Sequence, residues 1–392
     1  MNYLWEMLFK DVVGHIEIKN RLITSVLNKR ISHAQLFMGA EGSEKLALAI
    51  AYAQFIACEN KQTQGLQGGL LADSCGSCPS CIKYHKLAHP DLHFTFPVAT
   101  TKIVTKKPIS ENFIKEWREA LLESNYYLSL NEWLIKLGIE NKQGSISVNS
   151  ANSIIKTLGM SSYEGNYKVM IIWMIEKMHH DAIPKILKIL EEPPEKTLFI
   201  LLTEDPNNIL KTITSRTQLV KLKPLDDSSI SNYLKSNFNL PQERIDSLVH
   251  VADGNFKNLL PILANNEEPN PYFDIFRQMM LLAYGRDFAK MRTNADKVSK
   301  MGRENIKQLM YFGLKTVRMC MYQSLGSTNL IKASGQELDF IKKFSKFVHY
   351  NNAPEITDVL NDCIFHISRN VNGKIVIMDT LLKISGILYN SK

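Results

Sequence analysis

Residues 168–222 have the sequence KVMIIWMIEKMHHDAIPKILKILEEPPEKTLFILLTEDPNNILKTITSRTQLVKL, and this stretch decides the fold. Three short apolar runs in it predict buried strands, at residues 169–174, 198–202 and 218–222. Between the first two, residues 181–190 have apolar side chains at helical spacing, with Pro184 in the first turn and Pro193 and Pro194 after the end. Strand, helix and strand in this order predict a right-handed parallel unit of a doubly wound α/β domain.

The carboxyl end of the first predicted strand is where a nucleotide-hydrolysing protein would place an Asp-Glu pair, because chemistry in such a sheet gathers at strand ends. The Asp would act through Mg²⁺ and the Glu on the attacking water. Trp173 and Met174 stand there instead. Neither side chain can hold a metal or accept a proton, so apolar residues occupy the place where catalysis is expected.

A strand, a glycine-containing turn and a helix are also predicted over residues 33–58, HAQLFMGAEGSEKLALAIAYAQFIAC, and this order suggests a phosphate-binding loop. The residues that would cradle phosphates are Gly39, Gly42 and Lys45. Glu44 occupies the position where a Gly normally lets the backbone approach the phosphate, and Leu46 replaces the Ser or Thr that binds Mg²⁺. Because a carboxylate repels a triphosphate, we expect no hydrolysis at this loop, while binding without hydrolysis stays open.

Four of the six cysteines cluster in the sequence, at Cys58, Cys75, Cys78 and Cys81. Such spacing in a chain without an export signal favours a metal over disulfides. Four thiolates predict a tetrahedral, closed and therefore structural Zn²⁺ site. Histidines that follow closely could each replace one cysteine: His85, His89 and His93.

Composition and length set broad limits. A chain of 392 residues predicts two or three domains, and 45% hydrophobic residues are enough for real cores. The longest apolar run is too short to span a bilayer, and the N-terminal residues show no export signal, so we expect a cytoplasmic protein. The net charge of +8 permits a nucleic-acid partner without requiring one.

The segments around the predicted α/β domain are less regular. Residues 97–147 combine a polar, basic stretch with helical segments rich in Trp and Tyr, and we interpret them as a surface insertion. Its lysines could contact phosphate or belong to a solvated loop: Lys102, Lys106 and Lys107. Short helices are predicted after residue 222, a linker at residues 265–271 (NNEEPNP), and helix throughout the rest of the chain.

Together these motifs resemble the clamp-loader branch of the AAA+ proteins. The segments that carry the resemblance are VGH (13–15), HAQLF (33–37), SYEGNYKVMII (162–172), KILKILEEPPEKTLFILLT (185–203) and TSRT (214–217). The last is similar to the family's Ser-Arg-Cys motif, with Thr217 in place of the Cys. The cysteine module interrupts the core just after the phosphate-loop helix, as it does in this family.

The resemblance implies an AAA+ fold: an α/β core with a doubly wound parallel sheet and an inserted zinc module, a small helical lid domain, and an all-α C-terminal collar domain. We expect the core at residues 1–223, with the zinc module at 58–81 and the insertion at 97–147. The lid is expected at 224–265 and the collar, through which the family's subunits form a ring, at 271–392.

The resemblance also implies a function. The altered phosphate loop and strand end match a subunit of the DNA polymerase III clamp loader that has no intrinsic ATPase, and Lys257 stands near where an ATPase would have its sensor-2 Arg. Arg216 matches the arginine finger, which completes the ATP site of the neighbouring subunit. Implied partners are the gamma/tau-type ATPase subunits and the delta subunit in a hetero-oligomeric ring, the sliding clamp and primed DNA, with no membrane. The complex as a whole is a DNA-directed DNA polymerase, a nucleotidyltransferase.

Three alternatives stay open. Arg216 could be a structural residue that caps a strand or pairs with an acid such as Glu192. The chain could be an ATP-hydrolysing gamma/tau-type subunit of the same machine, which would require hydrolysis without an Asp-Glu pair. It could also be a stand-alone, zinc-containing DNA-binding protein on a decayed ATPase core, which predicts tight, salt-sensitive DNA binding by the isolated chain.

Overall fold

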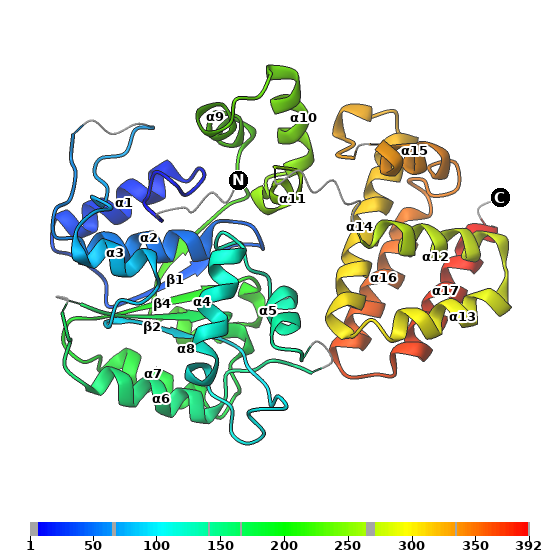
Figure 1. Cartoon of the computed structure of the whole chain (residues 1–392). Coiled ribbons are helices and arrows are strands. Elements are labelled where there is room, and N and C mark those ends of the chain that lie inside the picture. Colours follow the sequence, from blue (N-terminus) through cyan, green and yellow to red (C-terminus); the bar gives the residue numbers. More distant parts are fainter. Residues whose placement is uncertain are drawn as a thin grey trace. The chain divides into compact units, whose positions relative to one another are not determined.

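The computed structural model describes residues 7–64, 68–139, 142–164, 167–263, 271–333 and 335–390. These residues form two compact units (Figure 1). Unit 1 comprises the described residues up to Leu260 other than Lys142, and unit 2 comprises Lys142 and the described residues from Pro261 onward. Most of the predicted linker at 265–271 lies outside the described residues.

A five-stranded parallel sheet forms the centre of unit 1. Its strands are β1 (Ala34–Met38), β2 (Leu92–Thr95), β3 (Lys168–Trp173), β4 (Thr197–Thr203) and β5 (Gln218–Lys221), in the order β2-β3-β4-β1-β5. The three strands predicted from residues 168–222 are confirmed: the start of β5 is as predicted, and every other strand end differs from its prediction by one residue. Because all strands are parallel, their carboxyl ends meet at one edge of the sheet.

Alternate side chains of the buried strands enter two separate cores, as the two-residue period of a strand requires. In β3, for example, Ile171 packs on one face and Ile172 on the other. The first face is covered by α1 (Ile16–Leu27) and α2 (Lys45–Ala57), and the second by α6 (Val148–Gly159) and α7 (Ile183–Glu191) (Figure 1). Helices on both faces confirm the doubly wound α/β class.

Residues 97–147 do not form a surface insertion, so that interpretation is wrong. Their helices α4 (Ile114–Glu123) and α5 (Leu130–Lys136) belong to the core of unit 1, where Trp117 and Trp133 are fully buried. The Trp117 ring lies 5.0 Å from the Trp173 ring at the end of β3, measured between centroids. Burial of such large apolar side chains stabilises the packed position over a solvated one. The three lysines of the basic stretch are exposed.

The described residues of unit 1 contain four further α-helices, and a fifth spans the boundary between the two units. They are α3 (Pro79–His85), α8 (Lys211–Thr214), α9 (Asp227–Asn237) and α10 (Gln242–Ala252), and α11 (Leu260–Leu263) contains the boundary between the units. Asp226 caps α9 by accepting a hydrogen bond from the backbone N–H of Ser229, at 2.6 Å. The helices predicted after residue 222 are therefore present.

From Pro271 onward, the described residues of unit 2 form helices joined by loops, as predicted. Its helices are α12 (Phe273–Gly285), α13 (Phe288–Ser299), α14 (Arg303–Ser324), α15 (Gly335–Phe344), α16 (Ala353–Ser368) and α17 (Gly373–Asn390). They enclose a core of their own, in which Gly313 of α14 lets the Phe276 ring approach: a Cβ there would lie 2.4 Å from a ring carbon.

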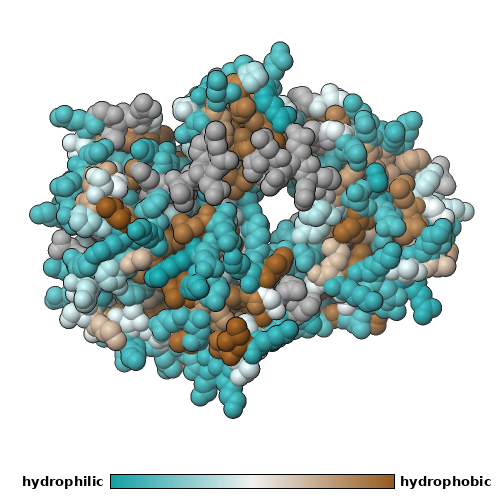
Figure 2. Space-filling model, viewed as in Figure 1, coloured by the Kyte–Doolittle hydropathy of each residue, from teal (hydrophilic) through white to brown (hydrophobic). Residues whose placement is uncertain are grey.

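The surface seen in Figure 2 is mostly hydrophilic, and hydrophobic residues appear on it singly or in small groups. No helix among the described residues has both the length and the apolar character needed to cross a bilayer.

Candidate functional site

The predicted phosphate loop is formed by the turn between β1 and α2. Gly42 has a positive φ of 74°, and a Cβ at this position would lie 1.8 Å from the side-chain oxygen of Asn255. The loop therefore requires Gly there, because Asn255 fills the space beside it. The Asn255 amide also donates a hydrogen bond to the carbonyl of Glu41, at 3.2 Å. Residues after β5 thus close the loop from one side.

Lys45, the lysine expected to face phosphate, is engaged by the protein itself. Its ammonium group lies 2.8 Å from a carboxylate oxygen of Glu204 and donates to the carbonyl of Ala40 at 3.0 Å. Glu204 directly follows β4, which pairs with β1, so the ends of these strands bring the two charges together. A carboxylate therefore occupies the place of a counter-ion that a phosphate would otherwise supply.

Glu44 is buried, with 3% of its surface exposed, and accepts a hydrogen bond from the hydroxyl of Tyr127. Burial raises the pKa of the Glu44 carboxyl from 4.5 to about 8, against the opposing effects of the Tyr127 hydrogen bond and the charges of Lys19 and Lys45. The carboxyl is therefore mostly protonated at neutral pH. We expected Glu44 to repel a triphosphate by its charge; in the structure it is a neutral group that binds another part of the chain.

This buried carboxyl predicts a pH-dependent effect of Glu44→Gln. A folded pKa above the unfolded value means that the folded state holds the proton more tightly, so this group lowers stability as the pH rises from about 4.5 to about 8. Gln does not titrate and can still accept from Tyr127. We expect Glu44→Gln to be more stable by about 3 kcal/mol at pH 7, with little difference near pH 4.5. Urea unfolding at several pH values checks this; an equal difference at pH 5 and pH 8 would contradict it.

Lys257 lies on the other side of the loop, between two carboxylates. Its ammonium group is 2.9 Å from Glu41 and 2.8 Å from Glu132 of α5. Burial disfavours the charged form, but the two carboxylates outweigh it and hold the pKa of Lys257 above its usual value. The position that we compared with a sensor-2 Arg is therefore occupied by a lysine that is already paired.

Little space remains at the loop. The cavity there has a volume of about 20 Å³, and Tyr126, Tyr127, Leu128 and Trp173 contribute to its wall. Pockets that bind small ligands usually measure about 300–1,000 Å³. The cavity that the loop lines is therefore far smaller than a usual ligand pocket.

The carboxyl end of β3 carries no acid, as the sequence indicates. Trp173 and Met174 are buried there, and Met174 has a positive φ of 57°. The next carboxylate along the chain, Glu176, accepts a hydrogen bond from the backbone N–H of Glu204 at 3.1 Å, and burial raises the pKa of Glu176. This edge thus offers a packed aromatic residue where a metal and an attacking water would have to sit.

The four predicted cysteines lie together, with all four sulfur atoms within 4.8 Å of one another. Cys58 and Cys75 are separated by 3.7 Å, and Cys75 and Cys81 by 4.0 Å. Sulfur atoms at the corners of a tetrahedral zinc site are about 3.8 Å apart when the Zn–S distance is about 2.3 Å. Among the described residues, the cluster contains no histidine, so the alternative ligands are not needed.

The surroundings of the cysteines also suit a metal. Backbone N–H groups donate to the sulfurs of Cys58, Cys75 and Cys78, at 3.3, 3.3 and 3.5 Å. The hydrogen bond between the Cys58 and Cys81 thiols lowers the pKa of Cys58 and raises the pKa of Cys81, so the two sulfurs hold one proton between them, which a bound metal would displace. The residues present therefore fit a structural zinc ion, held by four sulfurs.

Arg216 lies between α8 and β5, and 35% of its side chain is exposed. Its Nε and Nη2 lie 2.6 and 2.5 Å from one carboxylate oxygen of Glu191, and its Nη1 donates to the carbonyl of Thr212 at 3.0 Å. The acid is Glu191 rather than the Glu192 that we named. Glu191 is the last residue of α7, whereas the backbone of Glu192 has already left the helix. The Arg216 side chain is thus partly accessible to another molecule, and it forms an ion pair with Glu191 of the same chain.

Four residues of this site were not predicted from the sequence: Tyr127, Glu132, Glu204 and Asn255. Glu204 had a usable signal, because it directly follows a predicted strand whose carboxyl end lies at the same edge as the phosphate loop. The other three come from segments far from the loop in the sequence, and no motif marks them.

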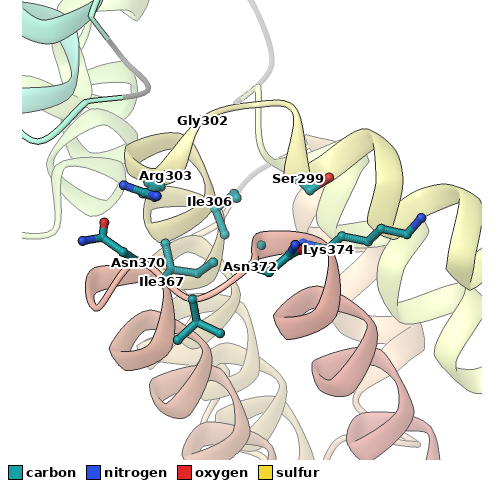
Figure 3. A pocket seen from close by; sticks show the side chains of 10 residues that line it. Ser299, Gly302, Arg303, Ile306, Ile367, Asn370, Asn372 and Lys374 are labelled. Carbon is teal, nitrogen blue, oxygen red and sulfur yellow. Dashed lines mark hydrogen bonds between the residues drawn. The ribbon is translucent and has the colours of Figure 1, made fainter.

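A larger cavity, of about 480 Å³, lies in unit 2 where α14 and α17 begin (Figure 3). Lys374 at its wall pairs with Asp296, at 2.6 Å, and the Asn372 side chain accepts hydrogen bonds from the backbone N–H groups of Lys374 and Ile375 in the first turn of α17. The ammonium group of Lys374 and the N–H groups in the first turn of α17 thus already have partners within the chain.

Comparison with known proteins agrees with this geometry. A family model described as "DNA polymerase III, delta subunit" matches residues 14–226, more than half of the chain. DNA polymerase III subunit delta' of Bacillus subtilis is 29% identical over 213 residues, which are 54% of this chain and 49% of the relative. DNA polymerase III subunit tau of the same organism is 25% identical over 260 residues, 65% of this chain and 37% of the relative. The chain thus matches about half, or less, of the length of these relatives.

Two solved structures align over most of the chain. A DNA polymerase III gamma subunit-related protein from Thermotoga maritima has a TM-score of 0.37 and 14% identity, and covers 94% of this chain and 99% of its own. The Bacillus subtilis DNA clamp loader delta protein has a TM-score of 0.30 and 8% identity, covering 93% and 99%. With TM-scores below 0.5, these two structures carry no argument about this chain.

Proposed function

The chain belongs to the DNA polymerase III delta subunit family, and from this premise we propose that it is a delta-prime-type, non-catalytic subunit of a clamp loader with an AAA+ core. It helps a hetero-oligomeric ring of gamma/tau-type and delta subunits to place the sliding clamp on primed DNA. Its lid and collar are residues 224–265 and 271–392, and its four cysteines hold one structural Zn²⁺.

The observation that carries this proposal is the occupied phosphate loop. Glu204 neutralises Lys45, Glu44 is bound by Tyr127, and the remaining cavity measures about 20 Å³. The end of β3 provides Trp173 instead of the acids that would bind Mg²⁺ and activate water. A subunit with this loop contributes to ATP turnover only through a neighbour.

Arg216 is the group that can act on a neighbour's ATP in this proposal. A guanidinium supplied in trans stabilises the charge that develops on the transferring phosphoryl group. Arg216 is partly exposed at the edge of unit 1, and it would exchange its contact with Glu191 for a phosphate oxygen when the ring forms.

The test is ATP binding and hydrolysis by the purified chain alone, with its zinc content measured on the same sample. We expect no hydrolysis above background, no saturable ATP binding, and about one zinc per chain. Turnover by the chain alone would instead favour a gamma/tau-type ATPase subunit, which the similarity to the tau relative makes the leading alternative. Tight, salt-sensitive binding of DNA by the isolated chain would favour a stand-alone DNA-binding protein.

A further inference from the structure

Residues 126–132 contact the phosphate loop and the segment after α10 at the same time. Tyr127 donates its hydroxyl to Glu44 of the loop, and its ring lies 5.7 Å from the ring of Phe256, centroid to centroid. Glu132 pairs with Lys257, the residue after Phe256, and Lys257 pairs in turn with Glu41 of the loop. One short stretch thus links two parts of unit 1 that are more than 200 residues apart in the sequence, Glu41 and Lys257 being separated by 216.

The groups that contact the loop resemble, in charge and in shape, those that a bound nucleotide would present. A triphosphate at such a loop would present negative oxygens to lysines and a ring to an apolar wall. Here the negative oxygens are those of Glu132 and Glu204, which face Lys257 and Lys45, and the ring is that of Tyr127. The chain supplies each of these groups itself.

We propose that residues 126–132 are a resident, intramolecular ligand of the phosphate loop, which occupies the place of a nucleotide and joins the loop to residues 255–257 without one. This inference rests on the proposed function, in which the loop binds no nucleotide. It adds that residues 126–132 hold the loop in position instead. An ammonium group as buried as that of Lys257 is costly to leave unpaired, so Glu132 and Glu41 hold the two segments together.

Hydrogen–deuterium exchange of the full chain, with and without Mg-ATP, tests this proposal. The variants are Tyr127→Phe, which removes only the hydroxyl that binds Glu44, and Glu132→Gln, which removes the charge that pairs with Lys257 but keeps an oxygen acceptor. The control is Glu123→Gln, which breaks the ion pair, at 2.8 Å, between Glu123 of α4 and Lys136 of α5, the helix that also contains Glu132. All three changes are small enough to leave the fold intact.

We expect the wild-type amides of residues 41–46 to be protected without ATP, and ATP to leave them unchanged. In Glu132→Gln, amide exchange should become about tenfold faster at residues 41–46 and at residues 255–259. In Tyr127→Phe, exchange should become faster by about the same factor at residues 41–46 alone. Glu123→Gln should match the wild type at both segments.

Two results would overturn the proposal, and they differ in what else they reject. Saturable ATP binding that protects residues 41–46 in the wild type would reject both the resident ligand and the proposed lack of nucleotide binding. If ATP does not bind, but Tyr127→Phe and Glu132→Gln exchange no faster than Glu123→Gln, the resident ligand is rejected while the non-catalytic subunit stands.

Discussion

Removing zinc from the purified chain is expected to unfold the residues around the four cysteines and to lower the stability of unit 1. Structural zinc contributes about 10 kcal/mol or more of apparent binding free energy in small zinc-dependent modules at neutral pH. The whole free energy of unfolding of an ordinary domain is about 5–15 kcal/mol. Without a common ion for the sulfurs, the segment that connects Cys58 to Cys81 would therefore lose a stabilising contribution comparable to the stability of a whole domain.

The effect should reach beyond the cysteines because their segment is tied to the core. The carboxylate of Asp73 accepts the backbone N–H groups of Phe9 and Lys10, at 3.0 and 2.9 Å. Phe9 packs in turn on Phe55 of α2, with ring centroids 5.5 Å apart. Loss of the metal thus exposes part of the face that covers the sheet.

Chelation at neutral pH, followed by metal analysis, limited proteolysis and thermal unfolding, measures this. Cys78→Ser should bind no stoichiometric zinc and should be cleaved near the cysteines. Cys363→Ser is the control, because Cys363 is a buried thiol of α16 outside the cluster. A chelated chain that keeps its protease resistance and its unfolding midpoint would show that these sulfurs need no metal.

The strands and the faces of the helices could be predicted from the sequence because they follow local patterns. Apolar runs gave β3, β4 and β5, and helical spacing gave α7, within a residue or two. The position of β5 beside β1, rather than beside β4, could not be predicted in this way. It depends on pairing between residues about 180 positions apart, which no local pattern records.

In the candidate site, too, local sequence patterns could be predicted and tertiary contacts could not. Glu44 could be recognised as unusual because it breaks the pattern of a phosphate loop. Its partner Tyr127, 83 residues later, is a tertiary contact from a segment that looked like a surface insertion. The sequence therefore indicated that the loop is altered, and the structure added why: the same segment that buries Trp117 and Trp133 places Tyr127 and Glu132 at the loop.

Replacing Arg216 by Ala is expected to lower the ATPase rate of the assembled clamp loader by about a thousandfold or more, because an arginine supplied in trans contributes about 10³–10⁵ in rate to phosphoryl transfer. The isolated chain should lose little stability, since a partly exposed ion pair such as Arg216–Glu191 contributes about 0–1 kcal/mol. The measurement is DNA-stimulated ATPase of a complex reconstituted with the gamma/tau-type subunits, with assembly followed by size-exclusion chromatography.

Glu191→Gln separates the two interpretations of Arg216, because it breaks the same ion pair and leaves the guanidinium in place. If Arg216 acts on a neighbour's ATP, the Glu191→Gln complex should keep its ATPase within a few fold, while the Arg216→Ala complex assembles and does not turn over. If the ion pair is the whole role of Arg216, the two variants should behave alike and hydrolyse ATP at the wild-type rate. Wild-type turnover in an assembled Arg216→Ala complex would therefore limit this arginine to its ion pair with Glu191 of α7, and the trans role would be rejected.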